Sequence, residues 1–178
     1  MEKDIKEILF TKEEIKKRIE ILGKKISEDY KGKFPLFVCI LRGAFMFLAD
    51  LLREVQIPLS VDFMAISSYG GNTESTGQVK ILKDLDTSIK GRDVLIIEDI
   101  VDTGLTMDAV TRLLRTRKPK SLKICTLLDK EERRKIPVNI SYYGFKIPNK
   151  FVVGYGLDYK EKYRNLPFIG ILKEKIYM

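Results

Sequence analysis

Three strand-length stretches of this chain are rich in apolar residues: 34–41, 94–97 and 121–128. A strand covered on both faces has this composition, because neither face has to alternate toward water. Between and after these stretches, residues 43–55 have a dense apolar helical face and residues 106–117 form a second helical segment. Buried strands that alternate with helices predict an α/β fold with a doubly wound, mostly parallel sheet.

The clearest helix is predicted from Thr11 to about Asp29. Thr11 and Glu14 have the spacing of a capping box, and apolar residues recur below them at helical spacing. Residues 59–69 alternate as a strand, and the predicted partner strand is 79–82. Three further strand candidates are short and lie between Pro, Gly and Asn residues: 138–145, 151–155 and 168–172.

The composition fits one soluble globular domain. The chain has 178 residues, of which 44% are hydrophobic and 33% charged. It has no apolar stretch of about 18 residues and does not begin like a signal peptide, so we expect a cytoplasmic protein without a membrane span. Cys39 and Cys125 lie in apolar runs and are predicted to be buried hydrophobes in adjacent strands. The absence of histidine excludes histidine acid–base chemistry and zinc sites with histidine ligands.

The net charge of +8 favours anionic ligands, among them nucleic acids and phosphorylated metabolites. The most basic stretch, TRLLRTRKPKSLK at 111–123, is compatible with nucleic-acid binding. However, its cations cluster toward a helix C-terminus, where they interact favourably with the helix dipole, and no aromatic stacking pattern accompanies them. We therefore interpret the stretch as a solvated helix end and do not expect a nucleic-acid partner.

Three carboxylates follow the buried stretch 94–97: Glu98, Asp99 and Asp102. Like charges this close repel one another, so a cation or a set of hydroxyls should offset them. In open parallel sheets, ligands bind beyond the carboxyl ends of the strands. One capping carboxylate would be enough for the helix that follows, so a purely structural role leaves the others unexplained. The sequence predicts that Glu98 and Asp99 bind hydroxyls or a hydrated Mg²⁺.

The residues after these carboxylates are suited to a phosphate. Gly104 allows close backbone approach, Thr103 and Thr106 offer hydroxyl donors, and the helix that follows has its positive end here. The chain has no G-x-x-x-x-G-K-[ST] motif, and GYGLDY at 154–159 lacks the third glycine of a dinucleotide loop. A phosphate and a pair of hydroxyls on one small molecule describe a sugar phosphate.

The stretch VLIIEDIVDTGLT closely resembles the phosphoribosyl pyrophosphate (PRPP) signature of type I phosphoribosyltransferases. LRG at 41–43, SSYGGNTESTGQVK at 67–80 and KFVVGYGLDYKEKYR at 150–164 resemble the hypoxanthine-guanine phosphoribosyltransferases, and the similarity covers about 35–170. The resemblance implies Mg²⁺-dependent transfer of the 5-phosphoribosyl group from PRPP to N9 of hypoxanthine or guanine. The products would be IMP or GMP and pyrophosphate.

The resemblance also implies an architecture. It predicts a single domain over 1–178, with a core at about 30–145 and a small hood built from about 1–10 and 146–178. A mobile lid is expected at about 68–79, with Ser68 and Tyr69 at its base. Relatives form dimers or tetramers, so a homodimer or homotetramer is expected by analogy.

By the same resemblance, Glu98 and Asp99 hold the ribose hydroxyls, and Asp102 also exchanges a proton with N7 of the purine. Arg42 and Gly43 match the pyrophosphate loop, which typically has a cis peptide bond between Leu41 and Arg42; the family often has lysine at position 42. Arg164 would neutralise the leaving group. The residues implied to cradle the 5-phosphate are Asp102, Thr103, Gly104, Leu105 and Thr106.

For the purine, the resemblance implies that Lys130 donates to O6, Phe151 stacks on the ring and the Val152 backbone contacts the exocyclic edge. Asp158 lies near the purine and would be the direct ligand of Mg²⁺, with Glu98 and Asp99 as further metal-site carboxylates. Without the resemblance, Lys130 would be interpreted as a solvated lysine and Phe151 as a core residue.

Two alternatives remain at the level of sequence. The first is a PRPP-binding regulatory protein that binds nucleic acid, although the lid, Lys130 and Asp158 together favour an enzyme. The second is a different acceptor base. Xanthine use depends on contacts around Val152 and Asp158 that the sequence does not fix, whereas a pyrimidine acceptor would not be expected with the 150–164 segment.

Overall fold

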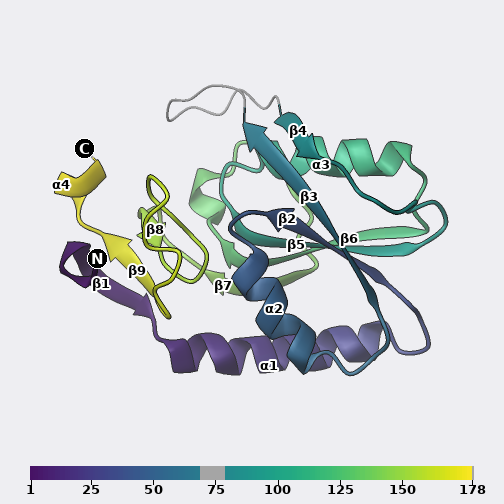
Figure 1. Ribbon diagram of the computed structural model, residues 1–178, viewed down its shortest axis with the longest axis horizontal. Helices are drawn as coiled ribbons and strands as arrows, with labels where there is room; N and C mark the ends of the chain where they lie inside the picture. The colour runs from purple at the N-terminus through teal and green to yellow at the C-terminus, as the bar shows by residue number, and fades with distance from the viewer. Residues whose placement is uncertain (69–78, 178) are drawn as a thin grey trace.

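A computed structural model describes residues 1–68 and 79–177 of the chain. Its main element is a six-stranded sheet in which only β3 and β4 pair in antiparallel fashion, while every other neighbouring pair is parallel. The predicted mostly parallel sheet is therefore confirmed (Figure 1). In spatial order, the strands are β4 (Val79–Lys83), β3 (Ser60–Ser68), β2 (Leu36–Leu41), β5 (Asp93–Val101), β6 (Ser121–Asp129) and β7 (Tyr142–Lys146).

Helices cover both faces of this sheet. Helices α1 (Lys12–Asp29) and α2 (Phe45–Glu54) pack on one face, and α3 (Leu105–Thr116) packs on the other; Figure 1 shows the first two below the sheet and α3 above it. Alternate residues of each central strand enter opposite cores. In β5, Leu95 belongs to the core under α1 and α2, while Ile96 belongs to the core under α3. This is the doubly wound arrangement expected from apolar strands.

Helix α1 begins as the sequence predicts. The backbone N–H of Glu14 donates to Oγ1 of Thr11 over 3.2 Å, and the N–H of Thr11 donates to the Glu14 carboxylate over 2.8 Å. This capping box satisfies two of the N–H groups that have no partner within the helix. The buried residues of α1, including Ile15 and Ile19, then face α2 and the sheet.

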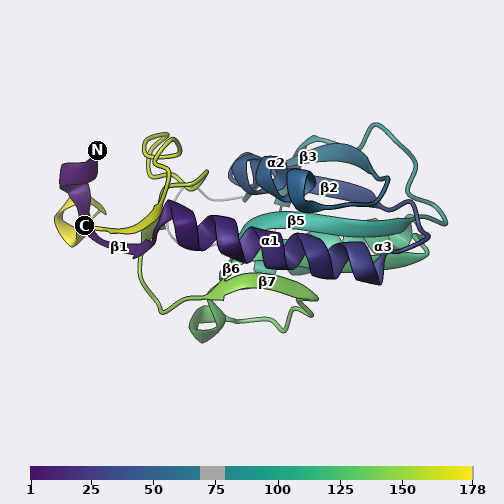
Figure 2. The same cartoon turned by 90° about the horizontal axis from the view of Figure 1, so that it is seen from below.

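A second, smaller sheet joins the two ends of the chain. Strand β9 (Ile169–Leu172) lies between β1 (Ile5–Phe10) and β8 (Val152–Val153), and both pairings are antiparallel. In Figures 1 and 2 the two termini lie side by side at this end of the molecule. The short elements η1 (Glu2–Asp4), η2 (Glu131–Arg133) and α4 (Glu174–Tyr177) complete the described part.

Several sequence-based boundaries are wrong. The predicted strand 151–155 is reduced to β8, because Gly154 and Tyr155 have φ values of 100° and 49° and leave the extended region. Strand β7 begins at Tyr142 rather than at 138. Cys39 and Cys125 are buried and free, as expected, but β5 lies between their strands, so the strands are not adjacent.

Strand β5 is longer than predicted. It continues past the apolar stretch to Val101, and its backbone pairs with β6 from Glu98 to Val101. Glu98 and Asp99 therefore lie inside the strand rather than after it, which fixes their backbone by pairing on the sheet. Within the described ranges, no helix combines the length and apolarity that a membrane span requires.

Candidate active site

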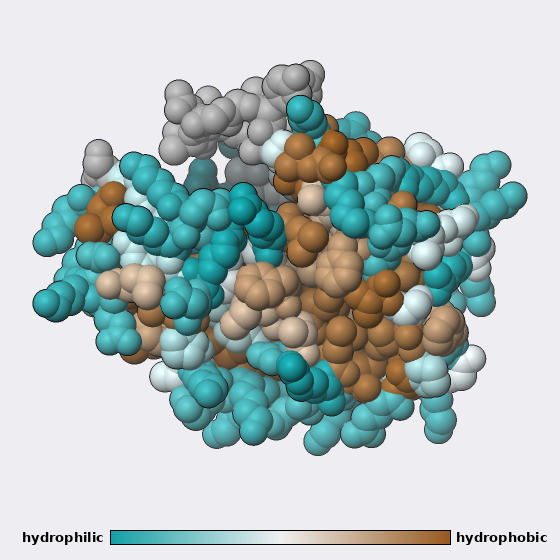
Figure 3. Space-filling model, in the orientation of Figure 1, coloured by the Kyte–Doolittle hydropathy of each residue, from teal (hydrophilic) through white to brown (hydrophobic). Residues whose placement is uncertain are grey.

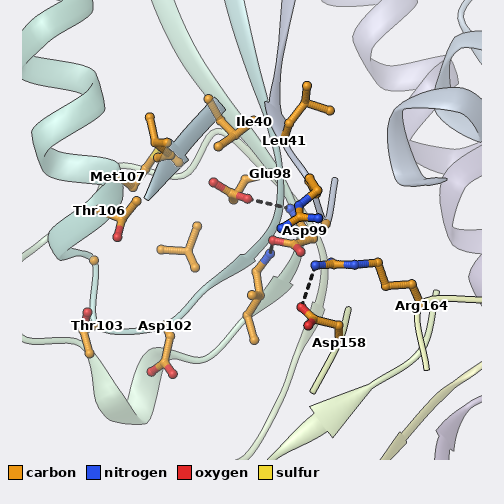
Figure 4. Close-up of a pocket in the computed structure, with 16 residues that line it drawn as sticks. Ile40, Leu41, Glu98, Asp99, Asp102, Thr103, Thr106, Met107, Asp158 and Arg164 are labelled. Carbon is orange, nitrogen blue, oxygen red and sulfur yellow. Dashed lines mark hydrogen bonds and ion pairs between the residues drawn. The ribbon is translucent and has the colours of Figure 1, made fainter. Parts of the chain in front are cut away.

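A cavity of about 320 Å³ lies at the carboxyl ends of β2 and β5. Figure 4 shows its acidic side chains, with Asp158 and Arg164 entering from the segment that precedes β9. Ten of the sequence-predicted site residues line it: Arg42, Gly43, Glu98, Asp99, Asp102, Thr103, Gly104, Thr106, Asp158 and Arg164. Elements far apart in the sequence thus contribute to one cavity, as the placement of ligands beyond strand ends predicts.

Glu98 and Asp99 form an acidic pair in the wall of this cavity. Glu98 is only 7% exposed, and burial together with the charge of Asp99 raises its pKa well above the usual range. Burial also raises the pKa of Asp99, although hydrogen bonds, among them one from the Ile100 N–H, and to a smaller extent the positive charge of Arg164 partly oppose this. In the part of the chain that the structure describes, neither carboxylate has an ion pair. The pair is therefore suited to a ligand that brings hydroxyls or a cation.

Gly43 has to be small because of this pair. A Cβ atom at Gly43 would overlap the carboxylate of Asp99. The peptide bond before its neighbour, between Leu41 and Arg42, is cis, as the family resemblance implied. The loop after β2 thus passes directly over the acidic pair.

Asp102 follows β5, and its carboxylate forms ion pairs with side chains from the segment after β6. Nζ of Lys130 and Nη1 of Arg133 each lie 3.4 Å from its Oδ2. Arg134 donates from Nε to the Asp102 carbonyl over 3.0 Å and also pairs with Asp129. The Oδ1 atom of Asp102 is buried and accepts no hydrogen bond from the residues described.

The loop between Asp102 and α3 packs closely against the segment after η2, which leaves no room for a side chain at position 104. Gly104 has a φ of 84°, and a Cβ there would lie 2.5 Å from the Ile136 carbonyl oxygen. The Thr103 carbonyl accepts a hydrogen bond from the Lys135 N–H over 2.9 Å, so this loop rests on the segment after η2. The N-terminal N–H groups of α3 begin here, and such a helix start favours an anion.

At the other side of the cavity, two arginines meet two carboxylates. Nη2 of Arg164 lies 2.9 Å from Oδ1 of Asp158, and Nη2 of Arg42 lies 2.9 Å from Oε1 of Glu161. Glu161 also lies 3.6 Å from Arg164. Sequence reasoning missed Glu161, because its place in a run of charged residues gives no sign of a contact with Arg42.

Of the four predicted purine residues, Asp158 lines the cavity, whereas Lys130, Phe151 and Val152 do not. Lys130 is buried and reaches Asp102, whereas Phe151 packs against Tyr177, with ring centroids 4.8 Å apart, and against Tyr159. Val152 is buried within β8. The structure therefore joins Lys130 to the site through Asp102, but no described contact joins Phe151 or Val152 to the cavity. Leu105, the first residue of α3, does not line it either.

The expected lid falls mostly outside the described residues. Ser68 is the last residue of β3, and Tyr69 lies in the segment that is not described.

Comparison with known proteins decides the family. Residues 5–160 match the model of the phosphoribosyl transferase domain. The chain belongs to this family. It is 54% identical over 177 residues to the hypoxanthine-guanine phosphoribosyltransferase of Staphylococcus aureus (99% of each chain) and 52% identical to that of Bacillus subtilis (99% of this chain and 98% of the relative). A crystal structure of a hypoxanthine phosphoribosyltransferase from S. aureus superposes with a TM-score of 0.97, at 53% identity, over 100% of this chain and 97% of that one.

This phosphoribosyltransferase is thus an enzyme of purine salvage. The relatives support a transferase and give no support to the alternative of a nucleic-acid-binding regulator. The phosphoribosyltransferase fold also accounts for the acidic pair: its sheet brings the carboxyl end of β5 beside the loop after β2.

Proposed function

We propose that this phosphoribosyltransferase transfers the 5-phosphoribosyl group from PRPP to N9 of hypoxanthine or guanine. The products are IMP or GMP and pyrophosphate. The observation that carries the proposal is the position of the buried Glu98 and the half-buried Asp99 in the same cavity as the glycine loop that precedes α3. One cavity then offers acceptors for ribose hydroxyls next to a binding site for a phosphate. The similarity to enzymes named for these bases supports the choice of acceptor.

In this proposal, Glu98 and Asp99 accept hydrogen bonds from the ribose hydroxyls. The 5-phosphate is bound by backbone N–H groups of the loop and by the hydroxyls of Thr103 and Thr106, with Gly104 allowing the close approach. Leu105 contributes its backbone N–H rather than its side chain, which agrees with its position as the first residue of α3. Such preorganised donors fix the sugar without rearrangement during the reaction.

Asp102 is proposed to exchange a proton with N7 of the base. Its buried Oδ1 has no hydrogen-bond partner among the described residues, so it is available to a ligand N–H. Lys130 lies beside it and would donate to O6 of a six-oxopurine. Phe151 and the Val152 backbone would contact the ring and its exocyclic edge, on the basis of the family resemblance alone.

Arg42, Gly43 and Arg164 are proposed to bind the pyrophosphate group. Both arginines line the cavity and carry the forked donors that suit phosphate oxygens. As C1 of the ribose gains positive character, these cations stabilise the charge that develops on the departing pyrophosphate. The base then attacks C1 through N9 while Asp102 manages the N7 proton.

The acidic residues fit Mg²⁺. Carboxylate oxygens are ligands that Mg²⁺ prefers, and this ion is usually bound by one or two carboxylates together with substrate phosphates. Asp158, with Glu98 and Asp99 on the ribose side, would hold it. When bound, the ion would neutralise charge on the pyrophosphate group.

The wider arrangement is also a proposal. We infer one domain with a core at about 30–145 and a hood from about 1–10 and 146–178, with Ser68 and Tyr69 at the base of a lid. We also propose a cytoplasmic homodimer or homotetramer, by analogy with relatives. An association between copies is supported by exposed apolar surface over α2 and β3, where Phe45 and Phe63 are 41% and 37% exposed (Figure 3).

An absorbance assay of hypoxanthine, guanine and xanthine with PRPP and Mg²⁺ tests the reaction. Formation of IMP and GMP supports it, and the xanthine rate decides whether the acceptor range is wider. PRPP binding without turnover of any base would refute the proposed activity.

A further inference from the structure

The carboxylate of Glu161 is bound by the guanidinium group of Arg42. Nη1 and Nη2 of Arg42 donate to Oε2 and Oε1 of Glu161 over 3.2 and 2.9 Å, although the residues are 119 positions apart. The same carboxylate lies 3.6 Å from Nη2 of Arg164. Glu161 therefore contacts both cations that line the pyrophosphate side of the cavity, without lining the cavity itself.

The backbone around Glu161 has an unusual conformation. Lys160, Glu161 and Tyr163 all have positive φ values, of 51°, 61° and 79°, although none is glycine. The Glu161 N–H donates to Oδ2 of Asp158 over 2.9 Å, and the buried Tyr163 donates from its hydroxyl to Asp4 over 3.0 Å. Positive φ at non-glycine residues persists where the surroundings impose it, and it occurs often at ligand-binding segments.

The four side chains that form ion pairs on this side of the cavity have balanced charges. Arg42 and Arg164 supply two positive charges, and Asp158 and Glu161 supply two negative charges. A pyrophosphate group carries several negative charges and needs both arginines. Asp158 is assigned to the metal, so Glu161 is the carboxylate that opposes the incoming anion.

We propose that Glu161 sets the affinity of the enzyme for the pyrophosphate group by competing with it for the guanidinium group of Arg42. It does so because a carboxylate uses the same pair of parallel donors that phosphate oxygens use. PRPP or pyrophosphate must displace Glu161 before Arg42 can bind it. This inference rests on the proposed function, since it takes the pyrophosphate subsite as given.

The side chains of Arg42 and Glu161 are 70% and 60% exposed. Exposed pairs of this kind are weak and screened by salt, so Glu161 yields readily to a multivalent anion. Removal of the Glu161 carboxylate should therefore increase the affinity for pyrophosphate by about two- to fivefold, and this increase should be smaller at high ionic strength.

Calorimetric titration of magnesium pyrophosphate into wild type and Glu161→Gln tests the proposal. We expect the variant to bind about two- to fivefold more tightly at low salt. The matched control is Glu131→Gln, which removes the same charge from an exposed pair with Lys146 (66% and 56% exposed) outside the cavity lining, and it should leave the affinity unchanged.

Unchanged or weaker binding by Glu161→Gln would overturn the proposal; weaker binding would mean that Glu161 positions Arg42 for the ligand. When Arg42 is also replaced (Arg42→Gln), Glu161→Gln should increase the affinity for pyrophosphate by less than it does in the wild type. An increase as large as in the wild type would contradict the role of Arg42. If wild type binds neither PRPP nor pyrophosphate, the proposed function itself fails, whereas wild-type binding without a gain in the variant refutes only this inference.

Discussion

Nζ of Lys130 lies 3.4 Å from Oδ2 of Asp102, and the lysine side chain is only 6% exposed. Because β5 and β6 are adjacent and parallel, the residues that follow them meet at one edge of the sheet. A carboxylate and an ammonium group are thereby held together. A six-oxopurine has N7 and O6 on the same edge, so the roles proposed for Asp102 toward N7 and Lys130 toward O6 require these two side chains to be neighbours.

Asp102→Asn should slow base attachment far more than it weakens PRPP binding. An amide cannot take up the N7 proton, so kcat should fall by about 10²- to 10⁴-fold, while the Kd for PRPP stays within about threefold. Steady-state kinetics and calorimetry measure the two quantities separately. Equal losses in both would remove the proton-transfer role.

Lys130→Gln should raise the KM for hypoxanthine. Loss of a buried, charged donor costs about 1–3 kcal/mol, which corresponds to about 5- to 150-fold. The control is Lys146→Gln, an exposed lysine of β7 whose partner is Glu131, and its KM should be unchanged. A rise in the KM for PRPP alone would place Lys130 on the sugar side instead.

Asp62→Asn should destabilise the protein in a pH-dependent way. Burial raises the pKa of Asp62, but hydrogen bonds from Phe63, Thr87 and Asp86 outweigh burial, and the pKa is lowered overall. The Thr87 N–H and hydroxyl each donate over 3.0 Å and the Asp86 N–H over 2.9 Å. These bonds connect β3 to the turn that follows β4.

Because the pKa of Asp62 is lower in the folded than in the unfolded protein, its ionised carboxylate stabilises the fold at pH values above the unfolded pKa. This stabilisation is lost as the pH falls through the pKa of the folded protein. Asp62→Asn should therefore cost about 1–3 kcal/mol at pH 7, and the difference from wild type should shrink toward about pH 3. Urea unfolding at both pH values measures it. Asp86→Asn, an exposed carboxylate in the same turn, is the control; a pH-independent loss in Asp62→Asn would contradict the assignment.

Gly104→Ala should lower the free energy of unfolding by more than backbone strain alone would. Its Cβ would meet the Ile136 carbonyl at 2.5 Å and the Arg134 Cδ at 2.8 Å, in addition to the cost of a φ of 84°. Gly32→Ala has a similar φ of 72° with no atom within 4 Å, so it isolates the strain, about 1–2 kcal/mol. Equal losses of unfolding free energy in the two variants would show that no clash occurs.

Local signals explain what the sequence predicts well. The start of α1 depends on Thr11 and Glu14, three residues apart, and the parallel sheet depends on apolar runs that each strand carries by itself. The segment from the end of β5 to the start of α3, Glu98 to Thr106, is also contiguous in the sequence, so its carboxylates, glycine and hydroxyls can be recognised without a structure. These features need no knowledge of distant contacts.

The rest depends on contacts between distant residues. Strand β8 ends at Val153, and the positive φ of Tyr155 that follows Gly154 is a conformation that no local pattern indicates for a tyrosine. Glu161 and Arg42 are brought together only by the complete fold. Likewise, Arg133 reaches Asp102 because η2 turns back beneath the loop that precedes α3, although its sequence neighbourhood is merely charged.

The antiparallel position of β9 between β1 and β8 affects how the polypeptide assembles during translation. Strand β1 precedes every other described strand in the chain, yet its only sheet partner among the described strands, β9, follows all of them. The parallel strands β2, β3, β5 and β6 can meet earlier, because all of them precede residue 130. A nascent chain can thus pair the central strands around β5 before β9 has been synthesised, and the smaller sheet can form only after β9 has left the ribosome.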